Sequence, residues 1–335
     1  HAPRPTPHAS RPTPHAPRPT PLIPSATSHP AALAGWKAAV ASESATCSLR
    51  AEVPSLSVPN WMAVLTGLTP EVHGLLGNRG PAEQRYSSLL SVSREMGSKS
   101  VMVGTPWFVD IVRSQLPALG GDGSVSSSYS EFEALTPYAA ANDGLREDAL
   151  MAGLNTTARL VLSQFAAVNS AAHMSGVSYE SGAAYAEALE QKAALLGRVV
   201  DRIRSQPGIP TTLLVASDHG HIRRGGAGGS SDDERQVGLV VFRAGSSLGS
   251  KSASAQCSSG EASTADLAPT IAALAKLPAP RQSQGVYIED AFDGTADGDT
   301  PTSPSAADDG TSAWAISHWQ VDHAGLLVGG AADFC

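Results

Sequence analysis

The sequence predicts an α/β fold in which a mostly parallel central sheet is sandwiched by helices. Two observations predict it: strand-like and helix-like segments alternate along most of the chain, and the strand-like segments are short apolar runs. Such alternation is typical of parallel sheets covered on both faces. Polar residues end two of these segments, at 168–173 (VNSAAH) and 217–221 (SDHGH). Ligands bind at the carboxyl ends of the strands in such sheets, so both stretches are candidate site residues.

The elements follow in this order. A helix at about 82–96 precedes a buried strand at 99–104, and a second strand is expected at 159–168. Apolar side chains recur at helical spacing through 179–205, and Gly208 and Pro210 are stop signals for that helix. A β-rich run at 211–221, a strand at 236–242 and a helix after Asp266, within 265–277, complete the pattern.

The composition limits the classes of function. The chain has 335 residues, of which 41% are hydrophobic, which is enough for a sizeable core. The net charge of −8 argues against nucleic acid as a partner, because a phosphate backbone needs a basic face. No apolar run approaches the ~18–20 residues of a membrane span. No signal peptide is visible, so the compartment stays open.

Three cysteines, Cys47, Cys257 and Cys335, lie far apart without a C-x-x-C pair. This spacing excludes a metal ribbon and a dense disulfide framework, and leaves a Cys47–Cys257 pair as one alternative.

The chain divides into three parts. Residues 1–30 contain three copies of a Pro-rich seven-residue unit, which predicts disordered, extended chain. Four histidines in this part also allow metal binding as an alternative. Residues 31–290 form the α/β domain. Residues 291–335 form an acidic linker and a tail, whose place in the fold is left open.

Two short stretches suggest chemistry. Asp218 and His219 offer a carboxylate and an imidazole at a strand end, and Gly220 after them allows close approach of a ligand. Ser57 stands before Val-Pro-Asn and an apolar run. Taken singly, each residue has an alternative without a functional role. Asp218 could cap a helix or turn, and His219 could be a surface residue. Ser57 could lie in a turn before a helix that starts near Asn60.

Four segments in one order are more specific. They are LSVPNWMAVLTGLTPEVHG, a stretch that starts at His173, SDHGH with the glycines and Glu234 after it, and ADLAPTIAALAKLPAP. Over residues 50–285 the chain resembles the alkaline phosphatase superfamily, most closely its type I phosphodiesterase/nucleotide pyrophosphatase branch, and is also similar to phosphoethanolamine transferases. The resemblance implies an alkaline-phosphatase-like fold with a variable insertion at 105–157. It also implies a phosphate ester as the substrate, either a small molecule or a lipid or glycan head group, and a secreted or lumenal location.

The resemblance also implies a site. In this family two divalent cations, normally Zn²⁺, lie about 4 Å apart and hold both the attacking and the leaving oxygen. Ser57 matches the nucleophile, which contacts one metal and forms a phospho-enzyme. Asn78 matches the asparagine that hydrogen-bonds a phosphate oxygen. Asp218 and His219 match ligands of the metal at the nucleophile, and His173 matches a ligand of the other metal.

The chain departs from this pattern in three places. The first strand of the family, which ends in an Asp ligand, is missing, because no Asp precedes Asp110. Asn169 stands where a carboxylate ligand is expected, and Ala227 replaces a histidine. Two dications ~4 Å apart repel by roughly 17 kcal/mol at an effective dielectric constant of about 20, and carboxylates normally offset this. The sequence therefore predicts one metal ion or none, with His221 as a candidate substitute ligand.

Three hypotheses follow. The first is a phosphoester hydrolase of the phosphodiesterase/pyrophosphatase type that uses a serine nucleophile and a divalent metal, with impaired activity. The second is a catalytically dead pseudoenzyme that binds phosphate-bearing ligands or partners. The third, an unrelated serine hydrolase using Ser57, His219 and Asp218, lacks a G-x-S-x-G elbow. It also requires neighbouring Asp and His side chains to meet, whereas successive side chains of a strand point apart. The first two hypotheses require Ser57 to lie close to Asp218 and His219.

Overall fold

The computed structural model describes residues 31–78, 86–105, 108, 126–127, 143–246, 262–288 and 324–329. The Pro-rich repeat at 1–30, most of the expected insertion at 105–157, Cys257 and Cys335 lie outside the described residues. The expectations for these segments, and the division into three parts, stay predictions.

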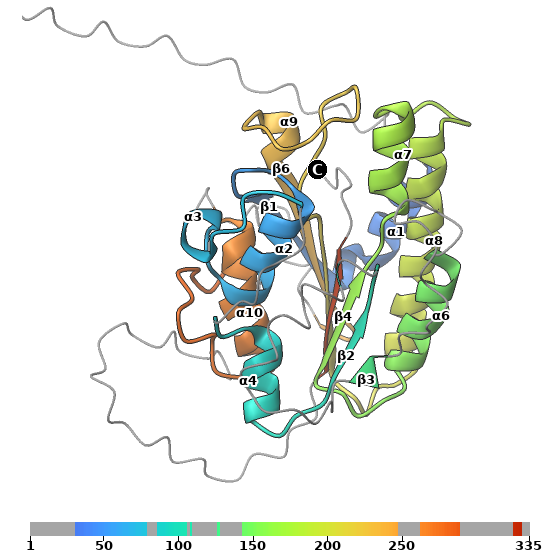
Figure 1. Ribbon diagram of the computed structural model, residues 1–335. Helices are drawn as coiled ribbons and strands as arrows, with labels where there is room; N and C mark the ends of the chain where they lie inside the picture. Colours follow the sequence, from blue (N-terminus) through green and yellow to red (C-terminus); the bar gives the residue numbers. More distant parts are fainter. Residues whose placement is uncertain are drawn as a thin grey trace, which may run out of the picture.

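A seven-stranded sheet forms the centre of the described part (Figure 1). Across the sheet the strands are β1 (Ser44–Arg50), β6 (Gln236–Arg243), β5 (Thr211–Ala216), β7 (Ala324–Gly329), β4 (Leu160–Gln164), β2 (Ser100–Val103) and β3 (Ser126–Ser127). The strands from β5 to β3 pair in parallel, and β6 is antiparallel to β1 and β5. The expectation of a mostly parallel sheet is confirmed.

Helices cover both faces of the sheet (Figure 1). One face carries α2 (Ser57–Thr66), α3 (Pro70–His73), α4 (Leu89–Glu95) and α10 (Leu267–Leu274). The other face carries α1 (Ala31–Val40), α6 (Asp143–Gly153), α7 (Ala167–Ser175) and α8 (Ala184–Arg204). The short helix α9 (Asp232–Arg235) follows β5 and precedes β6 in the sequence, and it lies at the edge of the sheet. The expected sandwich of helices is therefore confirmed.

Two apolar clusters hold these layers together. One packs Trp61 and Ile271 against Leu214 and Leu239 of the sheet, and the other includes Val199 and other side chains on the opposite face. All residues of β4 and β5 are buried, since helices cover them on both sides. This burial explains why both strands read as continuous apolar runs rather than alternating ones.

The expected elements are present with different ends. The strand expected at 159–168 ends at Gln164, because α7 begins at Ala167. The helix expected at 179–205 is α8, and the described part of the helix expected at 82–96 is α4, which the Ser88–Ser91 capping box starts. Three strands were not anticipated: β1 and β3 at the two edges of the sheet, and β7, which comes from the predicted tail.

Strand β7 lies between β4 and β5 and is parallel to both. Leu326 is in register with Val161 of β4, and Leu327 is in register with Leu214 of β5. Gly329, its last residue, is level with Gln164 and Ala216, the last residues of the two neighbours. The carboxyl ends of three adjacent parallel strands therefore meet at one edge of the sheet.

Among the residues that the structure describes, no helix combines the length and apolar character that a membrane span needs. Cys47 of β1 forms a disulfide. Both other cysteines lie outside the described residues, so its pairing with Cys257 stays a prediction.

Candidate active site

Ser57 is the first residue of α2, and its hydroxyl lies at the amino-terminal end of that helix. Pro59 fits the first turn of a helix, where its missing N–H needs no partner. The free N–H groups and the dipole of a helix amino terminus favour an anion at this position. The helix ends at Gly67, which adopts a left-handed conformation with φ 71°.

The loop before Ser57 is fixed by the buried side chain of Asn60. Its Oδ1 accepts hydrogen bonds from the Glu52 N–H (2.7 Å) and the Thr264 hydroxyl (2.9 Å). Its Nδ2 donates to the carbonyls of Glu52, Pro54 and Leu56 at 3.1–3.2 Å. One side chain thus holds the chain that leads into the helix and positions Ser57.

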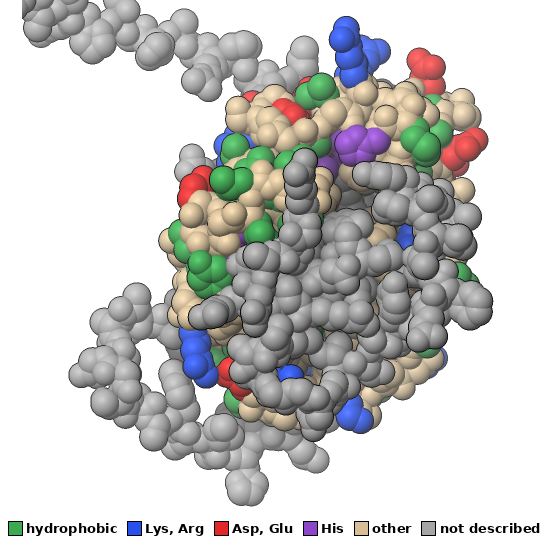
Figure 2. Space-filling model, viewed as in Figure 1, with side chains coloured by type: hydrophobic (Ala, Val, Ile, Leu, Met, Phe, Trp, Pro, Cys, Tyr) green, Lys and Arg blue, Asp and Glu red, His purple; other side chains and the backbone are tan. Residues whose placement is uncertain are grey.

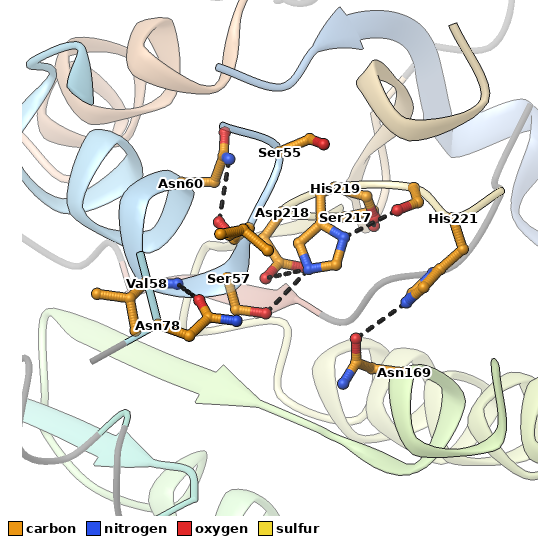
Figure 3. A network of polar contacts seen from close by, with 12 residues as sticks. Ser55, Ser57, Val58, Asn60, Asn78, Asn169, Ser217, Asp218, His219 and His221 are labelled. Carbon is orange, nitrogen blue, oxygen red and sulfur yellow. Dashed lines mark hydrogen bonds and ion pairs between the residues drawn. The ribbon is translucent and has the colours of Figure 1, made fainter. Parts of the chain in front are cut away.

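Asp218 and His219 follow the end of β5 and both face Ser57 (Figure 3). Ser57 Oγ lies 2.9 Å from His219 Nε2, and Asp218 Oδ2 lies 3.8 Å from the same nitrogen. Both side chains are buried: 2% of the His219 side chain and 5% of the Asp218 side chain are exposed. Side chains that follow one another point apart in a strand, but this condition does not apply to Asp218 and His219, because β5 already ends at Ala216.

The tautomer of His219 follows from its second contact. The carbonyl of Gly220 lies 2.9 Å from His219 Nδ1 and can only accept, so Nδ1 carries the proton. In the neutral ring Nε2 then has a lone pair, and it accepts the hydrogen bond of the Ser57 hydroxyl. A serine hydroxyl and an imidazole lone pair are therefore in hydrogen-bond contact.

Asn78 lies next to Ser57, although it is twenty-one residues further along the chain. Its Oδ1 accepts a hydrogen bond from the Val58 N–H at 3.0 Å. This bond turns the amide nitrogen of Asn78 toward the Ser57 hydroxyl (Figure 3). An N–H donor therefore points to the space beside the Ser57 hydroxyl.

A glycine-rich loop at 225–229 is attached to this centre by Ser55, which the sequence did not single out, and by Glu234, which the sequence placed in a family segment without a role. Ser55 donates from Oγ to the Gly229 carbonyl (2.8 Å) and accepts from the Gly228 N–H (3.0 Å). Glu234 accepts from the Gly229 N–H (2.8 Å) and forms a capping box with Ser231. The sequence signal was the S-D-D-E pattern of a capping box directly after the glycines.

His221 and Asn169 form a second polar contact across the site. His221 Nε2 donates to Asn169 Oδ1 of α7 at 3.0 Å, and its Nδ1 is buried without a hydrogen-bond partner among the described residues. Its ring centroid lies 5.1 Å from that of His219 and 5.2 Å from that of His173. His173 is exposed. Histidine side chains reach the surface near the upper end of Figure 2, where the strands end in Figure 1.

The residues present do not fit the two-zinc centre that the resemblance implies. A zinc site needs three or four ligands from His, Cys, Asp and Glu. No group of three such side chains that could hold a metal exists in the described part of the chain. Among the described residues, only the ligand types Asp218 and His219 converge at Ser57, while His221 is bonded to a neutral amide and Ala227 offers no donor.

His221 gives the fold a predicted pH dependence. Burial, together with the nearby His219 and His173, lowers the pKa of His221 from 6.5 to about 3. Below pH 6.5 the unfolded chain binds a proton that the folded state excludes, so the free energy of unfolding decreases as the pH falls. The decrease approaches about 1.4 kcal/mol per pH unit between these two values. We expect His221→Gln to flatten this decrease in denaturant titrations at pH 7 and pH 4.5; an unchanged slope would contradict the assignment.

Comparisons with known proteins agree with this fold. Residues 38–225 match the family described as type I phosphodiesterase / nucleotide pyrophosphatase. A comparison with curated proteins gives no match.

Solved structures with a similar fold include two phosphonate monoester hydrolases and a sulfatase. That of Agrobacterium radiobacter has a TM-score of 0.51 at 14% identity, covering 79% of this chain and 73% of its own. The phosphonate monoester hydrolase of Silicibacter pomeroyi has a TM-score of 0.50 at 14% identity, and the match covers 76% of this chain and 71% of that one. A 2-O GAG sulfatase has a TM-score of 0.53 at 16% identity, and the match covers 75% of this chain and 67% of that one.

At these identities the similar structures establish the fold, which is alkaline-phosphatase-like, as the resemblance implied. The match to the family spans more than half of the chain and includes Ser57, Asn78, Asp218 and His219. The chain therefore belongs to the type I phosphodiesterase/nucleotide pyrophosphatase family.

Proposed function

We propose that this protein hydrolyses a phosphoester of the phosphodiesterase type, with the Ser57 hydroxyl as the attacking group. The observation that supports the proposal most is the 2.9 Å contact between Ser57 Oγ and His219 Nε2 at the amino terminus of α2. A phosphate group placed against Ser57 would lie at the positive end of the helix dipole. It would also receive the N–H of Asn78, which stabilises charge that develops on a phosphate oxygen.

The charges at the site favour a diester over a monoester. The carboxylate of Asp218 is buried beside the nucleophile, and the low pKa of His221 keeps that ring neutral at pH 7. A phosphomonoester carries about two negative charges at neutral pH, whereas a diester carries one, so repulsion by Asp218 is smaller for the diester. We propose a small-molecule phosphodiester, or the phosphodiester of a lipid or glycan head group, as the substrate.

Turnover of two chromogenic substrates tests this proposal. We expect the full chain to hydrolyse bis(p-nitrophenyl) phosphate with a higher kcat/KM than p-nitrophenyl phosphate. Asp218→Asn removes the buried negative charge and is expected to reduce this preference. A wild-type chain that prefers the monoester would contradict the argument from charge.

A second candidate function is a catalytically dead protein that binds phosphate. The observations that favour it are Asn169 and Ala227, which place neutral groups where the family pattern has ligands. Calorimetric titration with inorganic phosphate separates the two candidates. Phosphate binding that Asn78→Ala weakens, in a chain without turnover of either substrate, would favour the binding protein over the hydrolase.

A further inference from the structure

The two nitrogens of His219 are arranged as a general base requires. A metal ligand would have the same tautomer, so the distinction lies in what Nε2 faces. Nδ1 donates to the Gly220 carbonyl, and Nε2 accepts from the Ser57 hydroxyl at 2.9 Å. A zinc-binding histidine would have to direct the Nε2 lone pair at the ion, and the serine oxygen would have to bind the same ion without its proton. The contact seen here instead joins a protonated hydroxyl to a free lone pair.

The side chains around the Ser57–His219 contact support a general base and do not add a third metal ligand. Asp218 Oδ2 lies 3.8 Å from His219 Nε2, close enough to stabilise the ring once it becomes an imidazolium. His221, the nearest further imidazole, donates its Nε2–H to Asn169 and cannot direct that atom at Ser57. No group of three metal ligands exists among the described residues.

We propose that Ser57 is activated by His219 as a general base, and that this chain cleaves phosphoesters by a serine–histidine pair in place of the metal centre of its family. This inference rests on the proposed function and specifies how its nucleophile is generated. A nucleophile and a base in hydrogen-bond contact, with a third group that orients and stabilises the base, are the parts that such a mechanism needs.

The reaction then runs in two balanced steps. The Ser57 Oγ–phosphorus bond forms while the hydroxyl proton moves to His219 Nε2, and the ester oxygen on the opposite side of phosphorus leaves and takes a proton from water. The imidazolium returns its proton to the solvent, so no net charge remains. In the second step water attacks phosphorus from the side that the ester oxygen left and gives a proton to the solvent, while His219, protonated again from the solvent, donates its Nε2–H to the leaving Ser57 Oγ.

A fluorophosphonate probe tests the activation of Ser57 without requiring turnover. The serine oxygen would displace fluoride from phosphorus while His219 takes the hydroxyl proton, and mass spectrometry would locate the adduct. We expect the full chain to be labelled at Ser57 at the same rate with and without a chelator. His219→Gln keeps a hydrogen-bonding side chain but accepts no proton, and we expect it to slow labelling by about 100-fold or more.

Turnover of bis(p-nitrophenyl) phosphate under the same two conditions separates the possible failures. Activity and labelling that persist in chelator support the serine–histidine pair. Activity that disappears in chelator and returns with Zn²⁺ overturns this inference and leaves the phosphoester hydrolase in place. Absence of both labelling and turnover, with and without added metal, overturns the proposed function and the inference together. The wild-type chain alone gives these results, so they stand even if His219→Gln fails to fold.

Discussion

Replacing Ser57 with alanine is expected to lower kcat/KM for bis(p-nitrophenyl) phosphate by at least about 10⁴-fold, because the attacking oxygen is removed. The fold should be little affected, since the Ser57 side chain is only partly buried and its hydroxyl bonds His219 alone among the described residues. Initial rates of p-nitrophenol release over a range of substrate concentrations measure the effect.

A matched control is Ser205→Ala at the end of α8, where the exposed serine hydroxyl bonds the nearby Arg202 carbonyl. It should keep wild-type turnover and wild-type thermal stability. Ser57→Ala with wild-type-like kcat/KM would show that another group attacks phosphorus and would end the proposal for Ser57.

Replacing Asn60 with alanine is expected to lower the free energy of unfolding by about 3–5 kcal/mol. The truncation removes the partner of the Glu52 N–H, the Glu52 carbonyl and the Thr264 hydroxyl. The carbonyls of Pro54 and Leu56 lose one bond each and keep a second, from the backbone N–H groups of Leu56 and Asn60. Unpaired buried groups cost more than the bonds themselves contribute, since each has lost its hydration. Urea denaturation followed by circular dichroism measures the change.

Asn60→Asp separates the two halves of this network. It keeps the acceptor for the Glu52 N–H and the Thr264 hydroxyl but loses the donor to the loop carbonyls. We expect an intermediate loss of stability, and a kcat that falls more than KM changes, because Ser57 is displaced from its position. Wild-type stability of Asn60→Ala would show that water replaces the network at no cost.

The general fold could be predicted because its signals are local. The run TTLLVA of β5 combines two threonines with four apolar residues and has no charged side chain, as suits a strand covered on both faces, and the spacing of apolar residues in α8 marks one helix face. Strand β1 was missed because it alternates buried and exposed residues at the sheet edge and contains several small polar side chains. Strand β7 was missed because a short apolar run in a polar tail does not reveal its pairing partners.

The candidate site could likewise be predicted only in part. Ser57, Asn78 and the Asp218–His219 pair follow from motifs that keep their order along the chain, and the structure brings them together. The role of Asn60 could not be predicted, because it bonds mainly backbone groups, which every residue type offers. The convergence of Asp218 and His219 depends on where β5 ends, and the ends of elements are what a sequence pattern defines least well.

The position of β7 has a consequence for how this protein reaches its native state. Its backbone closes the sheet by pairing with two strands that lie far upstream, and contacts between such distant segments form slowly because a long loop must first be ordered. Until it arrives, β4 and β5 each expose an open backbone edge, and such edges pair readily with other molecules. The yield of soluble protein after refolding should therefore depend on a competition between this closure and association of two incomplete sheets, and dilution should favour closure.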